Sequence, residues 1–203
     1  MHVVVAGCLA LAALATFSHG ASAAALSSRY TPIDNVSCRF DPIGTEPGDE
    51  ESQTKRCPGL GGVHVIVNVG GTTTSLGLEW PALRSRAAAN RELAAGWSLG
   101  EKLEWRGFQK TKGFVPQAAI LRVLFNREGS HAIERQVLAV IRVRLGRACL
   151  MGAVDMTDDK TPNERARALA DGAGRTFVCG RDRPMAAGPP TEWTARVLAS
   201  SAQ

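Results

Sequence analysis

The alternation of apolar and polar residues predicts a series of β-strands through the first two thirds of the chain. Val63–Val69 alternates valines with His64, Ile66 and Asn68, and Gly70-Gly71 then predicts a hairpin turn into a Thr-rich strand over 72–78. Further apolar runs predict strands at 103–106, 118–126, 137–145 and 148–156, with short turns at 110–113 and 146–147. Consecutive strands with short connections favour an antiparallel sheet.

Helical patterns interrupt and follow these strands. Residues 81–95 predict a helix, because Pro81 suits a first turn and Gly96 suits the position after the last turn. Thr161-Pro162-Asn163-Glu164 predicts a capping box that starts a helix ending near Ala173, followed by a last strand over 175–179. We therefore expect an α+β fold, in which an antiparallel meander packs against one or two helices.

The ends of the chain differ in composition from the middle. Val3–Phe17 is almost continuously apolar and Ala21-Ser22-Ala23 offers small residues, so residues 1–23 predict a secretory signal peptide. The run is too short for a membrane-spanning helix, which needs about 20 residues. Residues 24–183 then form a single α+β domain, and the Pro- and Gly-containing segment 184–203 predicts a linker and tail with a short helix at 191–200. Gly7-Cys8 allows the alternative of a lipid anchor on Cys8.

Four cysteines lie beyond this leader, and an even number in an exported chain indicates two disulfides. We expect them to pair in sequence order, Cys38 with Cys57 and Cys149 with Cys179, which is one of three possible connectivities. The first pair would bracket the segment 40–56, which is rich in Pro, Gly and acidic residues and predicts a loop. A periplasmic or secreted location follows from these features.

The charge of the chain is concentrated in its middle. Residues 24–83 hold 4 basic and 7 acidic residues, residues 84–147 hold 13 and 5, and residues 148–203 hold 7 and 7. Strand alternation places Arg142 and Arg144 on the face opposite Ile141, Val143 and Leu145. The predicted binding face comprises Trp105, Arg106, Arg122, Arg142 and Arg144. Its partner would be an anionic envelope component or an acidic protein; the alternative is a solvated arginine-rich face.

Catalytic and metal-binding motifs are weak in this sequence. Gly96–Gly100 spells G-x-S-x-G around Ser98, but no Asp lies between Ser98 and the later His131. The nearest acid, Glu128, is too close to His131 in sequence to lie on a separate loop. His64 and His131 have no ligand neighbour at metal spacing, and no C-x-x-C occurs. No Cys/His finger and no aromatic–glycine RNA-binding motif appears. We therefore predict no catalytic residue, no metal site, no cofactor and no nucleic-acid partner.

Two further clusters have a structural and a functional interpretation. Asp155, Asp158 and Asp159 precede the second predicted helix, where acids favour the helix dipole, although they are also potential Ca²⁺ ligands or a general acid. The tryptophans at 80, 97 and 105 lie near Arg84, Arg86 and Arg106. They either pack between helix and sheet or form an aromatic and basic surface for a sugar polymer or a protein.

The order of several motifs resembles a group of exported proteins from Gram-negative bacteria that have no known activity. The motifs include Tyr30-Thr31, Cys57-Pro58-Gly59, Trp105-Arg106-Gly107, Ala148-Cys149 and Phe177-Val178-Cys179-Gly180. The resemblance implies no catalytic residues and fits one domain with two disulfides. We expect a non-enzymatic, inhibitor-like binding or accessory protein of the envelope. The alternative is an envelope hydrolase that uses an acid such as Asp155 or Asp171.

Overall fold

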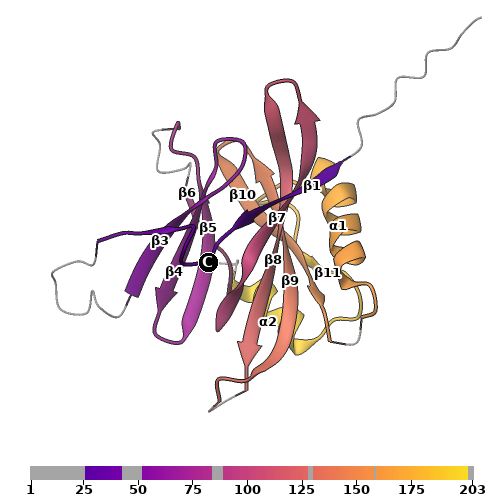
Figure 1. The fold of residues 1–203 in the computed structure, drawn as a ribbon. Helices are drawn as coiled ribbons and strands as arrows, with labels where there is room; N and C mark the ends of the chain where they lie inside the picture. Colours follow the sequence, from indigo (N-terminus) through magenta and orange to yellow (C-terminus); the bar gives the residue numbers. More distant parts are fainter. Residues whose placement is uncertain (1–25, 43–51, 84–88, 128–129, 158, 201–203) are drawn as a thin grey trace, which may run out of the picture.

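The computed structural model describes residues 26–42, 52–83, 89–127, 130–157 and 159–200. Within these segments the chain forms a five-stranded sheet, a six-stranded sheet and two helices. Figure 1 shows them in layers, with the five-stranded sheet on one side, the six-stranded sheet in the middle and helix α1 on the far side. The predicted α+β fold is confirmed, but the sequence did not predict that the strands divide into two sheets.

The six-stranded sheet contains the predicted meander. Its strands, in spatial order, are β1 (Ser27–Pro32), β7 (Ser98–Lys110), β8 (Gly113–Asn126), β9 (Ile133–Arg144), β10 (Arg147–Asp155) and β11 (Met185–Ala186). All neighbours are antiparallel except β10 and β11, which run parallel. The predicted strands at 118–126, 137–145 and 148–156 are confirmed, and the short strand at 103–106 is the centre of the longer β7.

The five-stranded sheet forms the second layer. Its strands, in spatial order, are β2 (Arg39–Phe40), β3 (Ser52–Pro58), β4 (His64–Gly70), β5 (Thr73–Glu79) and β6 (Ala89–Gly96). The predicted β4–β5 hairpin is confirmed, and Gly71 adopts a positive φ of 52° in its turn, which favours glycine. All four pairings in this sheet are antiparallel.

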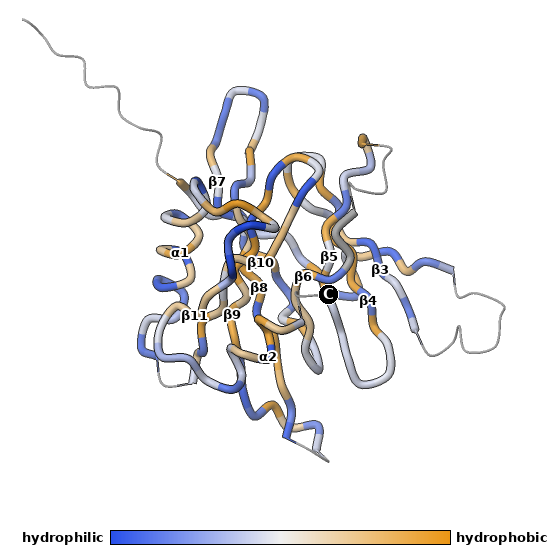
Figure 2. The backbone as a smooth tube through the Cα atoms, turned by 180° about the vertical axis from the view of Figure 1, so that it is seen from behind, coloured by the Kyte–Doolittle hydropathy of each residue, from blue (hydrophilic) through white to orange (hydrophobic). Residues whose placement is uncertain are grey.

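The main hydrophobic core lies between the two sheets. Alternation directs Val65 and Leu76 from one sheet toward Leu121 and Ile141 of the other, and all four side chains are fully buried. Trp105 is also fully buried there, and its indole N–H donates to the Thr31 hydroxyl at 2.9 Å. Figure 2 shows apolar segments in strands of both sheets. One face of the six-stranded sheet is therefore fully used for packing.

The two helices pack against the six-stranded sheet. Helix α1 (Pro162–Thr176) buries Ala166, Ala170 and Gly174, and these small residues let its backbone approach the sheet face that carries Ile120 and Leu138. Helix α2 (Glu192–Ser200) buries Val197 in the core between the sheets, and its Trp193 ring lies 5.2 Å from Phe125. The segment from Pro184 onward thus contributes β11 and α2 to the packed structure.

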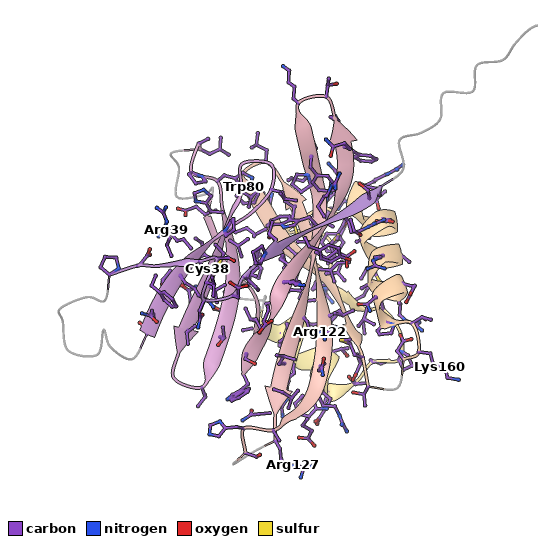
Figure 3. The ribbon with its side chains drawn as sticks, viewed as in Figure 1. Cys38, Arg39, Trp80, Arg122, Arg127 and Lys160 are labelled. Carbon is purple, nitrogen blue, oxygen red and sulfur yellow. A yellow bond between two sulfur atoms is a disulfide. The ribbon has the colours of Figure 1, made fainter. Side chains whose placement is uncertain are left out.

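Both predicted disulfides are present, and they pair in sequence order. Cys38–Cys57 ties the segment after β1 to β3, beside the five-stranded sheet (Figure 3). Cys149–Cys179 ties β10 to the turn after α1, across 30 residues. In the chain-entropy description, each disulfide stabilises the fold by about 3–4 kcal/mol, because closing its loop restricts the unfolded chain. Two disulfides are typical of proteins that fold in an oxidising compartment.

The prediction of a helix over 81–95 is wrong, because residues 89–96 form β6. This strand pairs with β5, and Leu93 and Ala94 are buried in the core between the sheets. Alanine and glutamate favour helices only weakly, by a few tenths of a kcal/mol per residue. Burial against a neighbouring sheet outweighs such a preference.

Three other local predictions are also wrong. The predicted loop over 40–56 contains β3 from Ser52, and Phe177–Cys179 forms no strand after α1. The predicted capping box is absent, because the Thr161 side chain makes no cap hydrogen bond. Instead the Asp159 carboxylate accepts the Thr161 amide at 2.9 Å. Leu145 lies in the exposed β9–β10 turn, beyond the face that it was expected to share with Ile141 and Val143.

Several predictions lie outside the described residues. They concern the signal peptide, Cys8, Arg84, Arg86 and Asp158. In the part of the chain that the structure describes, no helix has the length and apolar character needed to cross a membrane.

We predict that Gly152→Ala destabilises the fold where β10, β11 and α1 meet. A Cβ atom there would lie 2.3 Å from the Met185 carbonyl oxygen and 2.8 Å from Leu169 Cδ2. The clash should lower the free energy of unfolding by about 2–3 kcal/mol, as measured by urea titration. Gly172→Ala is the matched control, because its Cβ would meet no atom within 4 Å and should raise stability by about 0.5–1 kcal/mol. Equal effects of the two substitutions would contradict this packing.

Candidate functional site on the helix-covered sheet face

The second face of the six-stranded sheet is only partly covered by α1. Ile120, Leu138 and Val140 lie under the helix, in a small core of their own. Farther along the same face of β8, Arg122 is exposed and Leu124 is half-buried. The uncovered part of this face therefore presents Arg122 to solvent, unlike the face that packs into the core between the sheets.

A groove beside the start of α1 occupies this exposed part, and we name it the α1 groove. Its volume is about 660 Å³. Leucines and isoleucine contribute apolar surface, while three cationic and two anionic side chains surround it. The lining residues are Tyr30, Leu99, Gly100, Glu101, Lys102, Glu104, Ile120, Arg122, Leu124, Gln136, Leu138, Asn163 and Arg167.

A bulge in β7 shapes one wall of the α1 groove. β7 advances from Leu99 to Leu103 while its partner β8 moves only from Val123 to Leu121, so the extra residues leave the regular ladder. Gly100 lies in the bulge, and a Cβ atom there would be only 3.0 Å from Arg122 Cβ. A side chain at position 100 would therefore press on Arg122.

Glu104 is the buried acid of the groove, and it is ion-paired with α1. The Arg167 guanidinium donates from Nε to Oε1 at 2.7 Å and from Nη2 to Oε2 at 3.2 Å. Nη2 also donates to the Tyr30 hydroxyl at 3.0 Å, and Ser28 donates to the same carboxylate. Burial acts to raise the pKa of Glu104, but hydrogen bonds from Arg167 and Ser28 outweigh it and hold the pKa below its ordinary value.

A second ion pair continues the network along β7. Arg106 donates from Nε to Asp171 at 2.9 Å and also bonds the other carboxylate oxygen from Nη2. Its Nη1 donates to the Ser28 hydroxyl at 2.8 Å, so Ser28 links the two pairs. The Asp171 carboxylate raises the pKa of Arg106 above its ordinary value. Two arginine–carboxylate pairs thus fasten α1 to β7.

The predicted binding face divides into residues with different surroundings. Trp105 lies on the opposite face of β7, in the core, and Arg106 is paired with Asp171. Arg122 lines the α1 groove and forms no ion pair with the described residues. Arg142 is buried and Arg144 is exposed, although both lie on the helix-covered face. Burial, and then the nearby charge of Arg144, lower the pKa of Arg142.

The other candidate residues are spread through the fold. Ser98 begins β7 directly after β6, so it does not sit between a strand and a helix as a nucleophile elbow would. The ring of His131 lies 5.8 Å from that of Trp97, and His64 is on β4. Among the described residues, no three His, Cys, Asp or Glu side chains gather in a way that would hold a metal ion.

The candidate acids are engaged in local structure. Burial acts to raise the pKa of Asp155, but hydrogen bonds from the Thr157 amide and the Thr191 hydroxyl leave it below its ordinary value. Asp159 binds Arg165 at 2.6 Å, and this pair lowers the pKa of Asp159. These contacts support the structural interpretation of the acidic cluster.

Sequence reasoning missed Glu104 and Arg167, which together fix the edge of the groove. The alternation of Lys102, Glu104 and Arg106 with buried Leu103 and Trp105 was visible in the sequence and would have put all three on one face. The partnership with Arg167 was not visible, because 63 residues separate it from Glu104.

Comparison with known proteins gives no match: no protein-family model, no curated protein and no solved structure matches the chain. The function is therefore argued from the geometry of the groove and its surroundings.

We predict that the Glu104–Arg167 ion pair makes the free energy of unfolding decrease as the pH falls below 4.5. The pKa of Glu104 is lower in the fold than its ordinary value of 4.5, so its contribution is complete above pH 4.5 and is lost as pH falls through the lowered pKa. Glu104→Gln should cost about 3 kcal/mol at pH 7 and flatten the decline of stability below pH 4.5, measured by urea titration across pH.

The exposed neighbour Glu101 provides the matched control for this measurement. Glu101→Gln should leave both the stability at pH 7 and its decline in acid unchanged within about 0.5 kcal/mol, since no ion pair involves Glu101 in the described structure. A Glu104→Gln profile that parallels the wild-type profile would contradict the assignment.

Proposed function

We propose that the chain is an exported, non-enzymatic binding protein of the cell envelope that holds an acidic partner protein in the α1 groove. The observation that carries the proposal is the pair of exposed cations, Arg122 and Lys102, beside apolar surface in a groove of about 660 Å³. Neither cation is paired with a carboxylate among the described residues. An acidic segment with apolar side chains complements both features.

The scaffold suits an inhibitor-like or accessory role. Two α1-to-β7 ion pairs hold α1 against β7 beside the groove, so little ordering would be needed when a partner binds. Preorganisation of this kind raises affinity by lowering the conformational cost of association. The leader expected at residues 1–23 and the two disulfides support a site of action in the envelope or outside the cell.

The lowered pKa values of the carboxyl groups favour a binding role over acid-based hydrolysis. A general acid needs a raised pKa to remain protonated near neutral pH. The described carboxyl groups with a resolved shift, Asp34, Glu104, Asp155, Asp159 and Asp182, all have pKa values below the ordinary value. Asp155 and Asp159 do line a second cavity of about 540 Å³, but both carboxylates already accept hydrogen bonds from neighbouring threonines or Arg165. Asp171 is paired with Arg106.

We predict that Arg122→Glu removes partner binding. Immobilised protein should retain an envelope protein from extracts at about 0.05 M salt and release it near 1 M, because salt screens exposed charges. Arg122→Glu should reduce the captured amount at least tenfold at low salt, measured by quantitative mass spectrometry. Its thermal unfolding midpoint should match that of the wild type, since Arg122 is exposed and unpaired.

Arg39→Glu is the matched control for this experiment. It makes the same charge change at an exposed position on β2, in the five-stranded sheet, where Figure 3 labels Arg39. Its capture should equal that of the wild type. Equal loss in both variants would mean that net charge alone drives capture, and turnover of a cell-wall substrate without a captured partner would favour the hydrolase; either result contradicts the proposal.

A further inference from the structure

Arg142 is a buried cation that forms no ion pair with the described residues. Its residue surface is only 4% exposed, and among the described residues its side chain makes one hydrogen bond, from Nη1 to the Gln117 carbonyl oxygen at 3.0 Å. The Nε atom is buried and has no hydrogen-bond partner in the part of the chain that the structure describes. Burying an unpaired charge costs several kcal/mol, so this arrangement needs an explanation.

Comparison with two paired arginines, Arg106 of β7 and Arg167 of α1, shows what Arg142 lacks. Arg106 and Arg167 each present the Nε and Nη2 edge of the guanidinium to both oxygens of a carboxylate. This is the two-pronged geometry by which arginine binds carboxylate and phosphate groups. Arg142 makes no hydrogen bond from that edge with any described residue.

Two more arginines lie next to Arg142 on the same face. Arg144 follows two residues later on β9, and the antiparallel register sets Arg147 of β10 opposite Arg144. The terminal Nη2 of Arg147 lies close to Gly180, where an added Cβ would be only 2.8 Å away. Arg144 and Arg147 are both exposed, and neither forms an ion pair within the described structure. We name these three residues the arginine cluster.

Mutual repulsion makes the arginine cluster unfavourable on its own. Side chains directly opposite in a sheet are about 5 Å apart, and like charges there destabilise the pairing. An anion at the centre would relieve this repulsion and supply the missing partner of Arg142. Cys149, opposite Arg142, carries the disulfide to Cys179, so the strand and turn beside the cluster are fixed.

We propose that Arg142, Arg144 and Arg147 form a binding site for a phosphate group, with the Nε and Nη2 edge of Arg142 as its anchor. A tetrahedral dianion offers oxygens to three guanidinium groups at once, whereas a planar carboxylate offers only two oxygens and one charge. Arg144 and Arg147 are exposed and form no ion pair with the described residues, so their side chains can turn toward a bound anion at little cost. The arginine cluster does not line the α1 groove, and this site therefore extends beyond the proposed function.

The test is a titration of the disulfide-bonded protein with inorganic phosphate, with sodium chloride adjusted to constant ionic strength. Calorimetry should show saturable binding with a Kd below about 1 mM, and the thermal unfolding midpoint should rise with phosphate concentration. The exposed double variant Arg144→Gln/Arg147→Gln should fold normally and bind at least tenfold more weakly. Arg142→Met, which keeps the apolar stem and removes the charge, should abolish binding.

A matched double variant and a lipid arm complete the design. Arg39→Gln/Arg127→Gln removes two exposed arginines elsewhere and should bind phosphate like the wild type. Vesicles of phosphatidylglycerol in phosphatidylcholine test whether the phosphate belongs to a lipid headgroup, with pure phosphatidylcholine as reference. Binding to either probe that is lost in the cluster variants, and only there, supports the site. Absence of saturable binding to both probes, or equal binding by the cluster and control variants, overturns it.

Discussion

Two arginine–carboxylate pairs fix α1 on the six-stranded sheet, and the features of this face depend on that attachment. Arg167 of α1 binds the buried Glu104, Asp171 of α1 binds Arg106, and Ser28 connects the pairs. The small residues on the buried side of α1 bring the helix close to the sheet but supply little directional packing. The ion pairs therefore set the position of α1, which in turn sets where the sheet remains uncovered.

The arginines at this face of the sheet fall into two groups, according to whether a carboxylate neutralises them. Arg106 and Arg167 are neutralised by carboxylates and stabilise the fold. Arg122 beside the groove and the arginine cluster at the β9–β10 end have no carboxylate partner among the described residues, and they supply the positive potential that an anionic ligand would meet. The net charge of the chain would not reveal this difference, because both groups consist of arginines.

Apolar runs joined by short turns were enough to predict the central meander, of which the run at 118–126 forms part of β8. The second sheet was not predictable in the same way, because Ala-rich β6 owes its form to pairing with β5 and to burial of Leu93. The sequence placed Arg142 and Arg144 on one face, but it did not distinguish the buried residue from the exposed one. That difference depends on tertiary packing around β9.

The most direct test of this account is a double-mutant cycle on Glu104 and Arg167, measured as free energies of unfolding at pH 7. Glu104→Gln, Arg167→Met and the combined variant isolate the energy that the two side chains share. A hydrogen-bonded and largely buried pair that positions α1 predicts a coupling of about 2–3 kcal/mol. A coupling within about 0.5 kcal/mol of zero would contradict the claim that this pair holds the helix on the sheet.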